Sequence, residues 1–196
     1  MNKAARTRQF IIETAAPIFN QKGVAGTAIS DIMEATRLAK GGLYGNFSSK
    51  EEMVAEVFDY IAEQEKQRLK AVTGPEPTAL AKFEALFSYY ARYPLNRSIA
   101  GGCPMLNFGV EADDTNPVLK RKVQELVQYF QERIRLLVQL GKKNGEFKKD
   151  WDEDKFAVLM FTMLEGAIFV TGIMNSNSQM LVVIDFLRKE IKRHCK

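Results

Sequence analysis

The sequence has few residues that could support metal, disulfide or nucleophilic chemistry. Its 196 residues include two cysteines, Cys103 and Cys195, too few for a disulfide framework in a chain of this length. The one histidine, His194, lies in a basic C-terminal segment, and no set of metal ligands or catalytic partners can be assembled around it. We therefore expect no metal, no cofactor and no enzymatic activity.

Long apolar segments are also missing. No uninterrupted apolar run approaches the ~18 residues typical of a membrane-spanning helix. The segment Met1 to Arg6 leads directly into charged sequence and lacks the apolar core of a secretory signal. A composition of 46% hydrophobic and 27% charged residues is typical of a folded globular protein. We expect a cytoplasmic protein that does not contact a membrane.

Positive charge is concentrated at the N-terminus. Residues 1–50 contain seven basic and three acidic side chains, a net charge of +4, which equals the net charge of the whole chain. The remaining 146 residues are therefore neutral overall. A basic segment attached to a neutral remainder is typical of a protein with a DNA-contacting domain, although a chance distribution of surface charge would give the same count.

The hydrophobic pattern predicts an all-α protein of about nine helices, because apolar residues recur at intervals of three and four. Gly23 is placed to end the first helix, Thr27 to cap the second, and Ser48 or Ser49 to cap the fourth. Gly74 to Pro77 breaks the chain. The expected helices cover 3–21, 28–35, part of 39–47, 50–72, a stretch ending before Pro94, 104–112, 117 to about 145, 152–174 and 179–192, with a loop at 95–103.

The segment from Thr27 to Phe47 has the spacing of a helix-turn-helix: a short helix, a three-residue turn and a second short helix that can enter the DNA major groove. Its apolar positions would pack against the first helix. Its outward positions are small or polar, which would let the backbone approach DNA closely. These outward residues are Thr36, Arg37, Lys40, Gly41, Gly42, Tyr44 and Asn46.

Residues 6–58 resemble the DNA-binding domain of the tetracycline-repressor (TetR) family of bacterial regulators. The motifs that carry the resemblance are Lys22-Gly23 ahead of Thr27, Ile32-Met33-Glu34-Ala35, Lys40-Gly41-Gly42-Leu43-Tyr44, and Asn46-Phe47 followed by Ser49-Lys50-Glu51-Glu52. Gly42 and Gly45 depart from the residues that the family often has there, a small hydroxyl residue and an aromatic. The remainder of the chain is similar to the family only in the order of its helices.

The resemblance implies a three-helix helix-turn-helix DNA-binding domain at 1–50, followed by a helical-bundle ligand-binding and dimerisation domain at 51–196. Double-stranded operator DNA is the implied partner. Thr27, Tyr44 and Lys50 would contact phosphate, and Lys40 a phosphate or a guanine edge. The full set of expected DNA-binding residues is Arg6, Arg8, Thr27, Arg37, Lys40, Gly41, Gly42, Tyr44, Asn46 and Lys50.

The last two expected helices differ in character from the others. The helix at 152–174 is apolar nearly all the way round, so it must be buried on several sides. Together with 179–192, it would form an isologous four-helix interface with a second copy. We expect a homodimer through these two helices, the alternative being that both belong to an ordinary core.

The resemblance also implies a small-molecule effector, often apolar or aromatic, that enters the C-terminal domain and weakens DNA binding. The protein would then be a repressor released from its operator, although activators exist in the same family. Aromatic and methionine side chains are the candidates for the pocket, although the same spacing fits a core. The expected pocket consists of such side chains and one cysteine. Its residues are Phe83, Phe87, Tyr90, Cys103, Met105, Phe108, Phe130, Met160 and Met163.

Two further features leave alternatives open. Cys103 precedes a helix that starts at Pro104, and a position near a helix N-terminus favours the thiolate form of a cysteine. Cys103 could then react with a thiol-reactive effector; the alternative is that it is a small buried thiol. Acidic residues near 107–114 could hold a metal or a polar ligand, or simply be solvated; they are Glu111, Asp113 and Asp114, beside Asn107.

The rival classes of protein are an enzyme with Cys103 as nucleophile and a helical interaction protein that makes no DNA contact. Salt-dependent DNA binding would separate both from a regulator.

Overall fold

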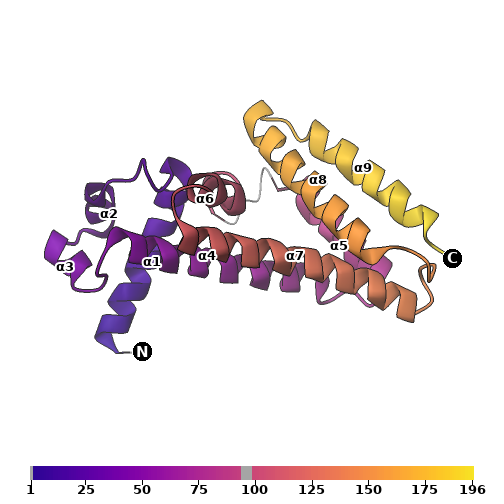
Figure 1. Ribbon diagram of the computed structural model, residues 1–196, viewed down its shortest axis with the longest axis horizontal. Helices are drawn as coiled ribbons and strands as arrows, with labels where there is room; N and C mark the ends of the chain where they lie inside the picture. The colour runs from indigo at the N-terminus through magenta and orange to yellow at the C-terminus, as the bar shows by residue number, and fades with distance from the viewer. Residues whose placement is uncertain (1, 94–98) are drawn as a thin grey trace. The chain divides into compact units, whose positions relative to one another are not determined.

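The computed structural model describes residues 2–93 and 99–196, and this part of the chain forms nine α-helices and no strand (Figure 1). The only β-type pairing in it is an isolated bridge between Phe147 and Cys195. The all-α prediction is confirmed, and the helix boundaries lie close to the expected ones. The helices are α1 (Lys3–Lys22), α2 (Ile29–Thr36), α3 (Lys40–Tyr44), α4 (Lys50–Thr73), α5 (Ala79–Ala91), α6 (Pro104–Ala112), α7 (Pro117–Lys143), α8 (Glu153–Met174) and α9 (Ser178–Arg193).

The chain divides into two compact units, each formed from segments that are separated in the sequence. The first unit comprises 1–65 and 98–125, and the second comprises 66–97 and 126–196. Both α4 and α7 supply residues to each unit. The predicted boundary at residue 50 between a DNA-binding domain and a ligand-binding domain stays a prediction, since the boundaries of the compact units fall at other residues. The expected loop at 95–103 lies partly outside the described residues.

The core of the first unit is formed by the apolar sides of α1 and α4, together with α6. Ile11, Phe19 and Val57 are fully buried. The ring of Phe58 on α4 lies 5.4 Å from that of Phe108 on α6. The helix that follows residue 103 is therefore part of the same core as the helix-turn-helix.

The core of the second unit is an aromatic cluster. The Phe83 ring lies 6.2 Å from Phe147 and 6.0 Å from Phe156, and Trp151 lies 4.6 Å from Phe156. A Cβ atom on Gly141 would stand 2.1 Å from the Phe147 ring, so only glycine admits this packing. Close contacts of this kind fix how α5 meets the segment between α7 and α8.

Three predicted helix ends hold and one is wrong. Gly23 ends α1 with a φ of +77°, Pro104 opens α6, and Ser49 accepts a bond at the start of α4. Thr27 does not cap α2: the cap is Ala28, whose N–H donates to the Asp31 carboxylate at 2.8 Å.

Two threonines point inward, against expectation. Thr27 is only 1% exposed, and its hydroxyl donates to the carbonyl oxygen of Gly23 at 2.6 Å. Thr36, expected to face outward, is buried and donates to the carbonyl oxygen of Ile32 at 2.6 Å. In each case a nearby main-chain carbonyl satisfies the hydroxyl, so the side chain can be buried at little cost.

Among the described helices, α8 alone has the length and apolarity of a membrane-spanning helix. Its most apolar 18-residue window has a mean hydropathy of 2.0, and 39% of that window is buried within the protein. A core or interface helix of a globular protein passes the same test of length and composition, so this is weak evidence for a membrane span.

Candidate nucleic-acid interface and ligand crevice

The short helix α3 is anchored on one side and exposed on the other. Leu43 and Phe47 are fully buried and attach it to the core of the first unit. The residues on the opposite side are exposed, and Tyr44 keeps 40% of its surface in solvent. The Lys40 ammonium lies 5.9 Å from the centre of the Tyr44 ring, which keeps a positive charge beside an aromatic side chain. We call this exposed set the α3 surface: Arg37, Lys40, Gly41, Gly42 and Tyr44.

The glycines of α3 leave space that the protein itself does not fill. A Cβ atom on Gly41 would meet nothing within 4 Å, and one on Gly42 would make only an ordinary contact with Leu38 at 3.5 Å. The packing of this unit therefore does not require glycine at either position. The bare backbone instead permits a close approach by a partner from outside.

Asn46 and Lys50 lie at the edge of the α3 surface, and both have internal partners. The Asn46 amide donates to the carbonyl oxygen of Gly42 at 2.8 Å and closes the end of α3. The Lys50 ammonium donates to the carbonyl oxygen of Val24 at 2.6 Å. These bonds position the start of α4 against the turn between α1 and α2, and a contact of either residue with DNA stays a prediction. The same holds for the buried Thr27.

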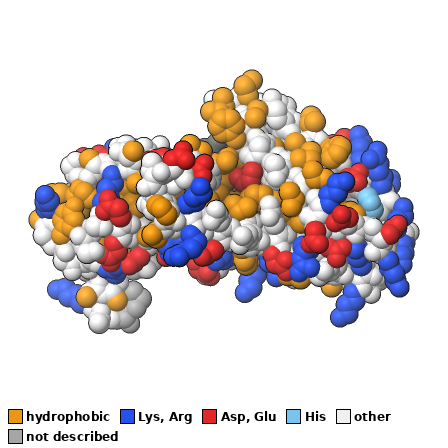
Figure 2. Space-filling model, viewed as in Figure 1, with side chains coloured by type: hydrophobic (Ala, Val, Ile, Leu, Met, Phe, Trp, Pro, Cys, Tyr) orange, Lys and Arg blue, Asp and Glu red, His pale blue; other side chains and the backbone are white. Residues whose placement is uncertain are grey.

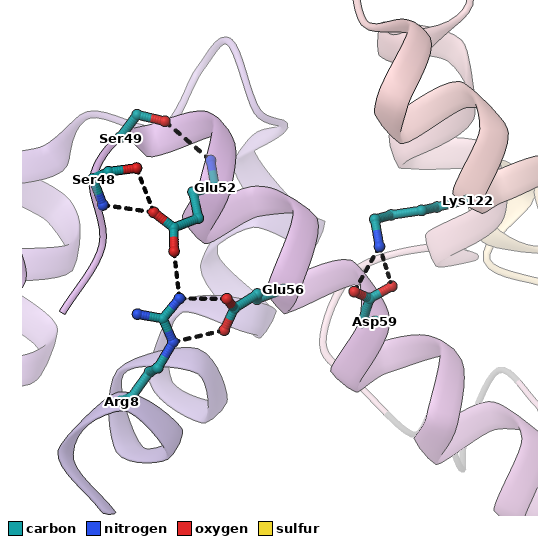
Figure 3. Close-up of polar contacts among 7 residues, drawn as sticks. All are labelled: Arg8, Ser48, Ser49, Glu52, Glu56, Asp59 and Lys122. Carbon is teal, nitrogen blue, oxygen red and sulfur yellow. Dashed lines mark hydrogen bonds and ion pairs between the residues drawn. The ribbon is translucent and has the colours of Figure 1, made fainter. Parts of the chain in front are cut away.

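Arg8 has an internal partner network that the sequence did not reveal. Its guanidinium donates to the carboxylates of Glu56 (2.8 Å from Nε) and Glu52 (Figure 3). It also lies 4.1 Å from the centre of the Phe47 ring. Hydrogen bonding to Glu56, followed by Glu52, raises the pKa of Arg8 above its ordinary value. The structure thus places Arg8 between α1 and α4, whereas Arg6 is exposed.

Glu52 joins this network to the start of α4. Its carboxylate accepts from the Ser48 amide at 2.6 Å and from the Ser48 hydroxyl at 2.5 Å, and the Ser49 hydroxyl accepts from the Glu52 amide at 3.1 Å (Figure 3). The bonds from Ser48, followed by the one from Arg8, lower the pKa of Glu52 to about 2. Ser49 thus caps α4, as one of the two predicted serines, while the Glu52 side chain reaches back to Ser48.

A polar clamp joins α6 to the end of α1 within the first unit. The Glu111 carboxylate accepts from the amides of Val24 and Ala25, both at 2.7 Å. The Asn107 amide donates to the main-chain oxygen of Asn20 at 2.8 Å. The buried Asn20 amide in turn donates to the carbonyl oxygens of residues 100 and 102 at 2.8 and 3.1 Å.

This clamp also bears on the alternatives left open for the acidic residues near 107–114, a metal or polar-ligand site or simple solvation. Glu111 is committed to main-chain amides, and Asp113 forms an ion pair with Lys120 at 2.7 Å. Within residues 2–93 and 99–196, no group of three histidine, cysteine or acidic residues could hold a metal ion. Glu111 and Asn107 are instead structural partners of the turn that precedes α2.

A crevice with about 450 Å³ of empty space, including its solvent-open part, lies within the second unit. Its walls come from the end of α4 and from α5, α7 and α8. Three of the expected pocket residues line it: Tyr90, Phe130 and Met160. The complete lining is Leu69, Thr73, Leu86, Tyr90, Phe130, Arg133, Ile134, Leu137, Met160, Phe161, Leu164 and Glu165.

The other expected pocket residues lie elsewhere. Phe83 and Phe87 are fully buried in or beside the aromatic cluster. Met163 lines a separate groove between α8 and α9, with about 880 Å³ of empty space that includes its solvent-open part. Cys103 is 4% exposed and belongs to the first unit, as do Met105 and Phe108. Helical spacing alone does not separate core from crevice, and it also gave no reason to select Arg133 or Glu165.

The outer side of α8 and α9 is an exposed apolar surface. The two helices run side by side in opposite directions, and Figure 2 shows hydrophobic side chains gathered where α8 ends and α9 begins, at the top of the view. Ile173 is 68% exposed and Val182 is 70% exposed. We call this set the α8–α9 face: Val158, Leu159, Phe169, Val170, Ile173, Met174, Leu181, Val182 and Phe186.

Two family models match the chain. The model described as "Bacterial regulatory proteins, tetR family" matches residues 11–57, and "Tetracyclin repressor-like, C-terminal domain" matches residues 79–187. The chain is 25% identical over 167 residues to the "HTH-type transcriptional repressor DhaR" of a Mycobacterium species, which covers 84% of this chain and 82% of the relative. It is also 25% identical over 169 residues to the "HTH-type transcriptional regulator TtgR" of Pseudomonas putida, covering 85% and 80%.

Solved structures agree with these matches over the whole chain. A TetR transcriptional regulator from Chloroflexus aurantiacus has a TM-score of 0.93 at 36% identity, covering 100% of this chain and 98% of the other. A TetR-family regulator from Cytophaga hutchinsonii has a TM-score of 0.91 at 36% identity, with the same coverage. The likeness therefore includes both the helix-turn-helix and the helices that follow it.

Proposed function

The chain belongs to the TetR family of DNA-binding transcription regulators, and from this premise we propose that it is a cytoplasmic, homodimeric repressor released from its operator by a small molecule. The observation that carries the proposal is the α3 surface, where exposed cationic and aromatic side chains flank a backbone with open space around it. The family's members regulate transcription and are not enzymes. DhaR, one of the relatives, is named a transcriptional repressor.

The α3 surface suits the major groove for reasons of charge and shape. Arg37 and Lys40 supply positive charge for phosphate or base edges, and Tyr44 offers a hydroxyl. Gly41 and Gly42 remove side-chain bulk from the helix that would approach the base edges. Specificity then depends on few side chains, and backbone contact with phosphate supplies much of the affinity.

Binding of DNA from upstream of the protein's own gene tests the proposal, by fluorescence anisotropy at several salt concentrations. We expect the affinity to fall with salt. Lys40→Ala removes one lysine from each protomer of the bound dimer and should reduce the magnitude of the slope of log K against log salt by roughly 1.8, about 0.9 for each lysine that neutralises a phosphate. Lys149→Ala is the matched control, because it removes an exposed lysine from the second unit. The double variant Lys40→Ala with Tyr44→Ala should lose binding while remaining dimeric. Wild-type protein that showed no salt-dependent, sequence-preferring binding would contradict the proposal.

We propose that the α8–α9 face is the dimer interface. Its side chains are apolar and exposed in the single chain, and burying such a surface in a second copy removes it from water. Ile173→Glu should give a folded monomer in sedimentation experiments, because this side chain contributes little to the packing of its own chain. Val110→Glu is the control: Val110 is 78% exposed on α6, outside this face, and the variant should stay dimeric. If both variants stayed dimeric, the interface would lie elsewhere.

We propose that the crevice of the second unit holds the effector. Its walls are mostly apolar, as in ligand sites that bury a small molecule, and a few polar groups border it. A ligand that binds one conformation of the dimer better than the other would shift the population away from the DNA-binding form. A thiol-reactive effector is not part of the proposal, because Cys103 is 4% exposed and lies outside this crevice.

A further inference from the structure

The crevice of the second unit has a strongly apolar wall. Nine of its twelve lining residues are aliphatic, aromatic or methionine. Ile134, Leu137 and Met160 are buried, so they form a fixed lining rather than mobile surface chains. An apolar body placed here would gain roughly 25 cal/mol for each Å² of apolar surface removed from water.

One basic side chain borders this wall. Arg133 lines the crevice from α7 and is half-buried. Over residues 2–93 and 99–196, it takes part in no ion pair or side-chain hydrogen bond. Its neighbour Glu132 is already bound by Arg135, whose Nε and Nη2 atoms both lie 2.6 Å from the Glu132 carboxylate oxygens. The nearest carboxylate on α7 is therefore committed to another arginine.

The remaining polar groups do not neutralise Arg133 in the described chain. The Thr73 hydroxyl donates to the carbonyl oxygen of Leu69 at 2.9 Å. Glu165 is the other charged lining residue, and it already has an interaction partner. The guanidinium is thus the charged group with donors left to offer a ligand. A guanidinium binds a carboxylate through two parallel hydrogen bonds, which gives both affinity and orientation.

We infer that the effector of this crevice is an amphipathic carboxylate: an apolar chain or ring system against α5, α7 and α8, with its carboxylate on Arg133. This inference rests on the proposed effector role of the crevice. A neutral molecule of the same shape would cover Arg133 without supplying an acceptor of matching charge, and desolvating an uncompensated charged donor lowers affinity. The site therefore discriminates by charge as well as by apolar fit.

Three ten-carbon probes test the inference on the full-length dimer by isothermal titration calorimetry: decanoate, decan-1-ol and decylamine. The two charged probes are kept below their critical micelle concentrations, and decan-1-ol is kept below its solubility limit. Their apolar chains are matched, so differences in affinity report on the head group. We expect decanoate to bind at least about tenfold more tightly than either other probe, the effect of a charge-assisted hydrogen bond. Decylamine binding most tightly would overturn the inference, because Glu165 would then select the head group.

Two variants test whether Arg133 is the source of the preference for a carboxylate head group. Arg133→Met keeps an unbranched apolar side chain and should weaken decanoate binding by about tenfold or more. Decan-1-ol should bind the variant at least as tightly as the wild type, because no charged donor is desolvated. Arg121→Met is the matched control: it removes one arginine from the same helix outside the crevice, and its partner Glu125 lies eight residues before Arg133, so the preference should persist. If Arg133→Met kept the wild-type preference, the inference would be wrong.

The test separates this inference from the proposed function. If decanoate and decan-1-ol bound equally, or if none of the three probes bound, the amphipathic carboxylate would be excluded. Operator binding and its dependence on Lys40 are measured without any ligand, and their outcome stands whichever probe binds. A decanoate complex that left operator affinity unchanged would confirm the ligand class but contradict the effector role.

Discussion

Replacing Arg8 with methionine tests whether this residue serves the fold or the DNA. The guanidinium is held by Glu52 and Glu56 above the Phe47 ring, and its side chain is 30% exposed. Partial exposure reduces the charge-assisted bonds to about 1 kcal/mol together. The ring contact contributes about 0.5–1 kcal/mol, and removal leaves two carboxylates one helical turn apart, which costs a few tenths more. We therefore expect Arg8→Met to lower the free energy of unfolding by about 2 kcal/mol.

Thermal and urea unfolding followed by circular dichroism measure this loss. For a chain of this size, about 2 kcal/mol corresponds to a fall in Tm of roughly 4–8 °C. Arg135→Met is the control, because it breaks a pair with Glu132 within one turn of α7, and such a pair contributes about 0.5 kcal/mol or less. An Arg8 variant no less stable than this control would refute the reasoning.

The pH dependence of the free energy of unfolding gives an independent check on the direction of the Arg8 effect. The pKa of Glu52 is lowered from its ordinary value of 4.5 to about 2 in the folded protein. A lowered carboxylate pKa stabilises the fold above the unfolded value and loses that contribution as pH falls toward the folded one. The bonds from Ser48 are the largest cause of this lowering, and they remain in Arg8→Met. The stability difference between wild type and the variant therefore reflects only the part due to Arg8; it should be full at neutral pH and shrink as pH falls below 4.5 toward about 2. A difference that grew in this range would contradict the network.

The same variant also distinguishes the structural role of Arg8 from a DNA contact. An arginine that neutralised a phosphate would contribute roughly 0.9 to the salt slope of operator binding. Since the structure commits the guanidinium to two carboxylates, we expect the slope of Arg8→Met to equal that of the wild type. A slope lower by roughly 1.8, about 0.9 for the arginine of each protomer in the bound dimer, would show that Arg8 leaves its internal partners on DNA.

Four further changes have expected outcomes. Glu146→Gln replaces a carboxylate that accepts from the first two amides of α5, and should cost about 1 kcal/mol in urea unfolding. Gly101→Ala places a Cβ 2.7 Å from a buried asparagine nitrogen at a φ of +108° and should destabilise more than Gly145→Ala, whose Cβ meets nothing within 4 Å at +78°. Phe83→Ala should cost about 3–5 kcal/mol, as expected for a core residue, in thermal unfolding. Gly41→Ala should raise stability by up to about 1 kcal/mol yet weaken operator binding measured by anisotropy.

The parts of the fold that could be predicted from the sequence are those with local signals. Gly23 and Pro104 mark helix ends through their own backbone geometry, and Ser49 does so through its hydroxyl. Helix ends marked by such local signals lie close to the observed ones. The apolar spacing sufficed for the helix count in the described chain. The exposed polar residues of α3 also follow from their spacing around Leu43.

The parts that could not be predicted depend on partners distant in sequence. Arg8 was expected on the DNA side because its acceptors lie 44 and 48 residues away on α4. Thr36 was expected outside because a threonine's polarity does not reveal that a main-chain carbonyl one turn earlier satisfies it. Phe83 and Phe130 have the same residue type and similar helical spacing, and only tertiary packing decides that one is core and the other lines the crevice.

The clamp between α6 and α1 has a consequence for the order in which the protein is made. The Asn20 amide donates to a main-chain oxygen 80 residues later in the sequence. The amides of Val24 and Ala25 donate to the Glu111 carboxylate, which lies 86 to 87 residues later. On the ribosome, α1 to α3 therefore emerge before Asn107 and Glu111 have been synthesised, and their turn stays hydrated until α6 follows. A gene truncated after α4 would encode a first unit without α6, and so without one part of its core. The helix-turn-helix would reach its final packing only when more than half of the chain has been translated.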